Sequence, residues 1–175
     1  LGVAKAYTTR VGSGPFPTEL TDAVGEGLQA RGKEFGSTTG RARRCGWFDG
    51  VLVRYATKVN GLASLAVTKL DVLDGCKKLK VCTGYRYQGK LYRDMPADLQ
   101  TLAECEPLYK TFKGWSSATT GATTYKQLPA EAKRYLQYLE EISECPIDMI
   151  STGSKRSETI ILRNPLKITQ ARGKR

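Results

Sequence analysis

Two short polar stretches, each placed directly after an apolar run, hold the residues best suited to recognise a purine base. Lys69 and Asp71 follow the run "LASLAV" at 62–67, and a Ser-Thr-Gly sequence at 151–153 follows "PIDMI" at 146–150. One carboxylate can accept hydrogen bonds from both N1-H and the 2-amino group of guanine, whereas adenine presents an acceptor at N1. An unpaired buried carboxylate oxygen is costly, so Asp71 is a candidate for selecting guanine over adenine.

The neighbouring groups complete this hypothesis. We expect the aliphatic stem of Lys69 to lie along the face of the base while its ammonium group stays in water. A backbone N–H of the 151–153 stretch would donate to O6 of guanine. The alternative is simpler: Lys-x-Asp triplets are frequent, and most of them are turn residues or part of a solvated face.

A second constellation, "GSTTGRARR" at 36–44, indicates an anion-binding loop. It places three arginines, two threonines and two glycines within nine residues. Arginine forks match carboxylate and phosphate oxygens, threonine hydroxyls add short donors, and glycine permits unusual backbone angles. A basic surface turn, or a loop that contacts RNA phosphates, is at least as compatible with this composition.

Composition excludes several classes of site. The 175 residues include no histidine, so a Ser/His or Cys/His nucleophile and the commonest transition-metal ligand are both absent. Five cysteines without a CxxC pair argue against a disulfide framework or a closed zinc site, and we expect free thiols. The formal net charge of +11 predicts an anionic partner without choosing between nucleotides, phosphorylated metabolites, nucleic acid and membrane surfaces.

The order of helix and strand patterns predicts an α/β fold. Turn-forming residues dominate the first 45 residues, with one short helix-compatible piece at 22–31. Apolar residues at helical spacing predict a helix over 47–59, and a second helix starts at Pro129 and ends before Pro146. Buried strands are expected at 62–67 and 146–150.

The middle of the chain has weaker signals. The segments 77–87 and 89–95 are expected to pair as a β-hairpin that turns at Gln88-Gly89-Lys90. A weak helix follows Pro96, and a threonine-rich loop at 116–124 is expected to be exposed. Alternating strands and helices favour a mostly parallel central sheet flanked by helices, in which ligands collect at the carboxyl ends of the strands.

No stretch of the chain is apolar enough to span a bilayer, and the N-terminal residues do not resemble a signal peptide. We therefore expect a cytoplasmic protein without membrane contact. Residues 1–165 are expected to form one domain, and 166–175 a basic tail.

With both loops in view, the sequence resembles the adenylosuccinate synthetase family. The segments that carry the resemblance occur in the family's order: "GVAKAYTTRVGSGPFPTEL", "EFGSTTGRARRCGWFDGVLVRYA", "LAVTKLDVLDG" and "YLEEISECPIDMISTGSKRSETIIL". The resemblance covers 1–165 and is weaker over 88–128. It implies a P-loop-NTPase-like layout and a magnesium-dependent ligase that joins IMP and L-aspartate into adenylosuccinate, with GTP converted to GDP and phosphate. This reaction belongs to AMP biosynthesis.

The resemblance also assigns roles to individual residues. It places Thr38, Thr39 and Arg41 on the carboxylates of aspartate, with Arg41 also near IMP, and it places Arg43 on GTP. The matched aspartate-binding stretch consists of Ser37, Thr38, Thr39, Gly40, Arg41, Ala42 and Arg43. The matched guanine-binding segments consist of Lys69, Leu70, Asp71, Ser151, Thr152 and Gly153. Val11 matches a position beside the IMP ribose.

Several family features have no counterpart in this sequence. The family's glycine-rich GDEGKGK phosphate loop, with its catalytic aspartate and magnesium site, is missing, as is its general-acid histidine. We therefore expect the C-terminal portion of the enzyme, with no catalytic residue and no metal ligand in this chain, inactive alone, and a homodimer only in the full enzyme. Lys155 stands where the family usually has an aspartate, so the details of this loop depart from the family pattern. The alternative hypothesis is a basic nucleic-acid-binding module.

Overall fold

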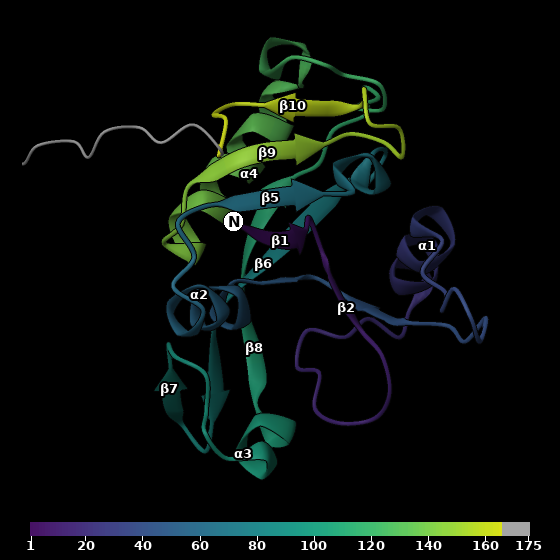
Figure 1. The fold of residues 1–175 in the computed structure, drawn as a ribbon. Coiled ribbons are helices and arrows are strands. Elements are labelled where there is room, and N and C mark those ends of the chain that lie inside the picture. Colours follow the sequence, from purple (N-terminus) through teal and green to yellow (C-terminus); the bar gives the residue numbers. More distant parts are fainter. Residues whose placement is uncertain (166–175) are drawn as a thin grey trace, which may run out of the picture.

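The structure, a computed structural model, describes residues 1–165 and has a mostly parallel sheet at its centre (Figure 1). The strands lie in the order β1-β5-β9-β10; β1, β5 and β9 are parallel, and β10 is antiparallel to β9. Their bounds are β1 Gly2–Lys5, β5 Leu65–Thr68, β9 Ile147–Ser151 and β10 Thr159–Ile161. The predicted α/β class and mostly parallel sheet are confirmed. The predicted basic tail at 166–175 lies outside the described residues.

A second sheet and a small ribbon complete the strands. The second sheet joins β4 (Phe48–Asp49), β6 (Lys78–Tyr87), β7 (Lys90–Tyr92) and β8 (Glu106–Lys113). The ribbon pairs β2 (Thr8–Arg10) with β3 (Arg44–Gly46). The predicted hairpin is confirmed as β6 and β7; Gln88 and Gly89 both have positive φ, as this tight turn requires.

Four α-helices and two 3₁₀ turns connect the strands of residues 1–165. They are α1 (Ala23–Gly32), α2 (Gly50–Val59), α3 (Leu99–Glu104), α4 (Ala130–Ser143), η1 (Leu70–Leu73) and η2 (Tyr125–Gln127). The predicted helices at 22–31 and after Pro129 are confirmed, and the Asp22 carboxylate caps α1 by accepting from two backbone N–H groups. None of the helices in this part of the chain is long and apolar enough to cross a membrane.

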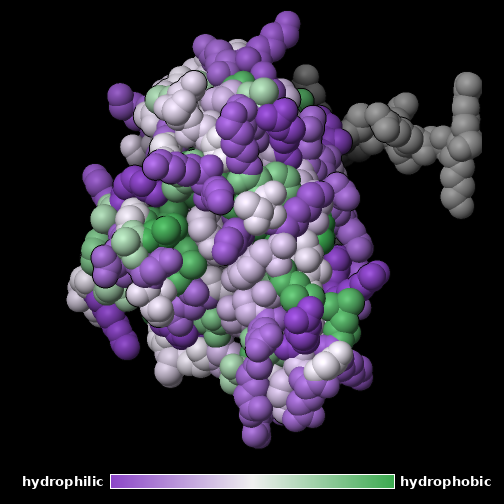
Figure 2. Space-filling model, turned by 180° about the vertical axis from the view of Figure 1, so that it is seen from behind, coloured by the Kyte–Doolittle hydropathy of each residue, from purple (hydrophilic) through white to green (hydrophobic). Residues whose placement is uncertain are grey.

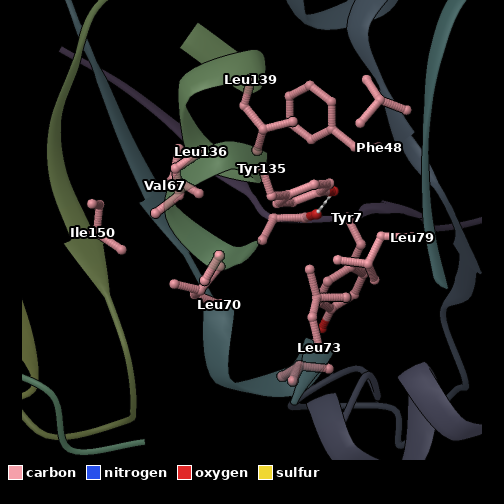
Figure 3. Packing of buried hydrophobic residues seen from close by; sticks show 14 of the residues in the cluster. Tyr7, Phe48, Val67, Leu70, Leu73, Leu79, Tyr135, Leu136, Leu139 and Ile150 are labelled. Carbon is pink, nitrogen blue, oxygen red and sulfur yellow. Dashed lines mark hydrogen bonds between the residues drawn. The ribbon is translucent and has the colours of Figure 1, made fainter. Parts of the chain in front are cut away.

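The main core lies between the central sheet and α4. Tyr135 and Leu139 of α4, Val67 of β5 and Ile150 of β9 are almost completely buried (Figure 3). The apolar face of α4 thus packs against the apolar face of the sheet, because residues three or four apart share one face of a helix and alternate residues share one face of a strand. The Tyr135 hydroxyl donates to the Ala6 carbonyl oxygen at 2.7 Å, which satisfies its polar end inside the core. Hydrophilic side chains cover much of the face seen from behind, with separate hydrophobic areas between them (Figure 2).

Two predictions about element boundaries were wrong. The first 45 residues contain β1, β2 and the start of β3 besides the helix. The strand β1 was missed because its partner β5 begins only at residue 65. The helix predicted over 47–59 begins at Gly50, since Phe48 pairs with Val81 in the second sheet and Asp49 caps the helix. A short apolar pair fits either periodicity, so tertiary pairing decides it.

The threonine-rich stretch at 116–124 is mostly exposed, as expected, but it contains one buried residue. Thr119 is completely buried, and its neighbours on both sides are exposed. The strand β8, which precedes this stretch, carried no recognised strand signal, since its two exposed lysines and one exposed threonine break the apolar alternation. All five cysteines are free, as expected.

Candidate functional site

The two polar loops lie side by side because β5 and β9 are parallel neighbours and both loops follow the carboxyl ends of these strands. A pocket of about 420 Å³ lies between them. Its lining includes Lys69, Asp71 and Val72 from the first loop and Gly153 and Lys155 from the second. The tertiary structure therefore places three of the six residues predicted to bind guanine, Lys69, Asp71 and Gly153, around one pocket.

Asp71 has a buried carboxylate oxygen, Oδ1, that faces this part of the structure without a hydrogen-bond partner within residues 1–165. Burial raises the pKa of this carboxyl, its own backbone N–H opposes that rise, and the nearby charge of Asp74 adds to it. A buried unpaired carboxylate oxygen is unfavourable by about 1–3 kcal/mol or more, so a donor supplied by a ligand would relieve a real cost.

Lys69 behaves differently from the prediction. Its backbone is left-handed, with φ of 60°, and its Nζ donates to the Gly32 carbonyl oxygen at 2.5 Å and to Glu34 Oε1 at 2.9 Å. The expectation that the ammonium group is solvated by water is therefore wrong, because it forms an ion pair with the buried Glu34 carboxylate. The side chain still lines the pocket. Leu70 is completely buried, so at this position only the backbone can serve a ligand.

The second loop is held by its own hydrogen bonds. Thr152 is buried; its Oγ1 donates to the Ala122 carbonyl oxygen at 2.8 Å, and its backbone N–H donates to the Glu158 carbonyl oxygen at 2.9 Å. The Ser151 hydroxyl donates to the carbonyl oxygen of Gly153 at 2.8 Å. Of the three predicted residues, only Gly153 lines the pocket between the two loops. A side chain there would collide with the Glu158 carboxylate.

The arginine-rich loop projects from the end of α1. Phe35 and Ala42 form an isolated bridge, and the Gly36 N–H donates to the Arg41 carbonyl oxygen at 2.8 Å. Gly40 turns the chain with φ of 64°. Residues 37–42 are exposed, and the described structure shows no side-chain hydrogen bond from Thr38 or Arg41. These two side chains are therefore open to a ligand.

One buried carboxylate connects this loop to the pocket between the two polar loops. Glu34 has a completely buried side chain whose Oε1 accepts from the Tyr7 hydroxyl at 2.6 Å and from Lys69 at 2.9 Å. Its Oε2 accepts from Lys5 at 2.8 Å and from Arg43 at 2.9 Å. Burial alone would raise the Glu34 pKa, but the hydrogen bonds from its four partners lower it to about 2. We call these five residues the Glu34 cluster.

The charge balance of the Glu34 cluster favours anions. Three cations surround one carboxylate, so two positive charges remain uncompensated, and the cationic side chains are between 23% and 33% exposed. Sequence analysis missed Glu34 because its partners lie 9 to 35 residues away. The only local signal was an acidic residue directly before a strongly basic loop.

The remaining predicted positions lie outside the pocket. Val11 is 69% exposed on the long loop after β2, and neither it nor the 37–43 stretch lines the pocket between the two polar loops. Within residues 1–165 no three His, Cys, Asp or Glu side chains come together to hold a metal ion.

Comparison with known proteins decides the family. The model of the adenylosuccinate synthetase family matches residues 1–160. The chain belongs to this family. It is 57% identical over 164 residues to the adenylosuccinate synthetase of Desulforamulus reducens, an alignment that covers 94% of this chain and 38% of that protein. The enzyme of Carboxydothermus hydrogenoformans is 59% identical over 162 residues, with 93% and 38% covered.

A solved structure of a family member gives the same fold. The fully ligated adenylosuccinate synthetase from Plasmodium falciparum is 36% identical, with a TM-score of 0.86 over 91% of this chain and 39% of that one. The chain thus spans about 38% of the length of its curated adenylosuccinate synthetase relatives. Membership in this family gives no support to the nucleic-acid-binding alternative.

Proposed function

We propose that this chain is the C-terminal part of a GTP-dependent ligase that forms adenylosuccinate from IMP and L-aspartate, with release of GDP and phosphate. In this proposal residues 1–165 hold the guanine base and contribute the aspartate loop. The observation that carries the proposal is the buried, unpaired Oδ1 of Asp71 in a pocket at the carboxyl ends of two parallel strands.

The pocket chemistry favours guanine. Guanine can donate N1-H and its 2-amino group to the Asp71 carboxylate, and the Gly153 N–H, which makes no hydrogen bond within the described residues, can donate to O6. Adenine would leave the carboxylate unpaired and turn an acceptor towards it. The lost charged hydrogen bonds correspond to a preference of about tenfold to hundredfold.

The Glu34 cluster then connects the base to the other substrates. Lys69 borders the pocket and Arg43 belongs to the aspartate loop, and both donate to the same carboxylate. In the proposal Arg43 reaches the phosphates of GTP, while Thr38 and Arg41 contact the carboxylates of aspartate. Val11, exposed on its loop, would lie beside the IMP ribose.

The chemical step itself requires groups from the rest of the enzyme. We propose that the phosphate loop, the general acid and the magnesium ligands belong to the larger part of the relatives that this chain does not span. This chain alone would then bind nucleotide without turnover. The proposal also includes a homodimer for the complete enzyme.

The test is a calorimetric titration of the purified chain with GDP, ADP and xanthosine diphosphate at two salt concentrations. The expected result is selective GDP binding that the Asp71→Asn substitution shifts towards the xanthine nucleotide, because an asparagine amide can donate to the 2-oxygen of xanthine. Asp94→Asn, at an exposed carboxylate, is the matched control and should leave selectivity unchanged. Equal binding of GDP and ADP, or none of either by a folded chain, would contradict the assignment of the base pocket.

A further inference from the structure

The side chain of Asp74 holds residues 115–122, which overlap the threonine-rich stretch at 116–124, in place by hydrogen bonds. This segment lies beside the base pocket. Asp74 Oδ1 accepts from the Trp115 indole N–H at 2.6 Å and from the Thr119 hydroxyl at 2.8 Å. Its Oδ2 accepts from the Thr119 backbone N–H at 2.7 Å and, at 3.4 Å, from that of Thr120. Both carboxylate oxygens of Asp74 therefore have hydrogen-bond partners within the chain, whereas Oδ1 of Asp71 has none among the described residues.

The far end of the same segment is tied to the second base loop. The Gly121 N–H donates to the Thr152 carbonyl oxygen at 3.3 Å, and the Thr152 hydroxyl donates to the Ala122 carbonyl oxygen at 2.8 Å. Near the first loop, the Gly75 N–H donates to the Trp115 carbonyl oxygen at 3.0 Å. The segment therefore spans from the loop that carries Asp71 to the loop that carries Gly153.

Thr120 lies between these two attachments and lines the pocket together with Lys69 and Asp71. It is exposed, whereas the adjacent Thr119 is completely buried. No hydrogen bond of the Thr120 hydroxyl is seen within residues 1–165. A hydrogen bond from the Thr120 hydroxyl to a ligand would cost little conformational entropy, because the backbone of this segment is already held in place before a ligand binds.

We propose that Thr120 is a third contact of the bound guanine nucleotide and that Asp74 is the positioning residue that holds it there. This inference rests on the proposed function and deepens it: the base site would be built from three segments of the chain. The charge of Asp74 also raises the pKa of Asp71. In this proposal Asp71 accepts hydrogen bonds from the guanine base, whereas Asp74 acts on the nucleotide only through Thr120.

The test compares GDP affinity in four variants of the purified chain by the same calorimetry. Thr120→Val should weaken GDP binding about threefold to tenfold, the effect of losing one neutral hydrogen bond, and Thr120→Ser should restore it. Asp74→Asn should weaken binding at least as much, because in either orientation the amide nitrogen faces an N–H donor, that of Trp115 or that of Thr119, from which it cannot accept. Thr111→Val, at an exposed threonine on β8, is the matched control and should bind as the unmodified chain does.

A double-mutant cycle separates positioning from general stability. If Asp74 acts through Thr120, the Thr120→Val change should have little further effect in the Asp74→Asn background. Selective GDP binding that Thr120→Val leaves unchanged would overturn the inference and leave the proposed function standing. A lower melting temperature of Asp74→Asn with an unchanged GDP affinity would reduce Asp74 to a purely structural residue. Failure of the unmodified chain to prefer GDP would overturn both proposals.

Discussion

Replacing the central carboxylate of the Glu34 cluster tests the electrostatic argument most directly. Glu34→Gln keeps the size of the side chain and removes the charge that faces Lys5, Arg43 and Lys69. The four hydrogen bonds lower the Glu34 pKa from 4.5 to about 2. At about 1.4 kcal/mol for each pH unit, this change corresponds to about 3 kcal/mol of folding free energy at neutral pH.

The assay is urea denaturation followed by circular dichroism, at several pH values. At pH 7 the variant should lose about 3 kcal/mol of unfolding free energy, equivalent to a fall of about 6–12 °C in melting temperature for a chain of this size. Because the folded-state pKa is lowered, the contribution of Glu34 is complete above the unfolded-state pKa and disappears as the pH falls towards about 2. The difference between the two proteins should therefore shrink between about pH 5 and pH 2.

Two further substitutions make this result interpretable. Tyr7→Phe removes one of the four donors to Glu34 and should cost about 1.5–3 kcal/mol, so it reports on the cluster even if Glu34→Gln fails to fold. Glu141→Gln, at an exposed position on α4, should change stability by less than about 0.5 kcal/mol. A Glu34→Gln protein within about 1 kcal/mol of the unmodified chain, or a difference independent of pH, would refute the reasoning.

Two other predictions concern the packing that supports the site. Burial raises the pKa of the Asp49 carboxyl despite hydrogen bonds from Tyr85 and the Leu52 N–H. This group therefore lowers the stability of the fold as the pH rises from the unfolded-state pKa to the folded-state pKa. Asp49→Asn should lower the free energy of unfolding by less than about 1 kcal/mol near pH 4. At higher pH the variant should become more stable relative to the unmodified chain, as measured by urea denaturation. A stability difference that stays constant with pH would contradict this. A Cβ at Gly114 would overlap the Cys76 carbonyl oxygen, so Gly114→Ala should lower stability by about 3 kcal/mol or prevent folding. Gly27→Ala, where only the distant end of a side chain is near, should stabilise α1 by about 0.5–1 kcal/mol; similar thermal melts for both alanine variants would disprove the packing argument.

Periodic patterns and short motifs were enough to predict part of the fold and of the site. The face of α4, the hairpin of β6 and β7, and the placement of two polar loops after buried strands all follow from residues near one another in the sequence. The pairing of Asp71 with Gly153 in one pocket followed as an expectation, because parallel neighbouring strands end at the same edge of a sheet.

The chemistry of individual side chains depended on partners that are distant in sequence, and only the tertiary structure decided it. Lys69 carries an ion pair because Glu34, 35 residues earlier, is folded against it. The buried position of Thr119 depends on Asp74, 45 residues away. Local propensity contains no information about which distant charge will share a desolvated site, whereas that neighbour determines whether a side chain is free for a ligand or already satisfied.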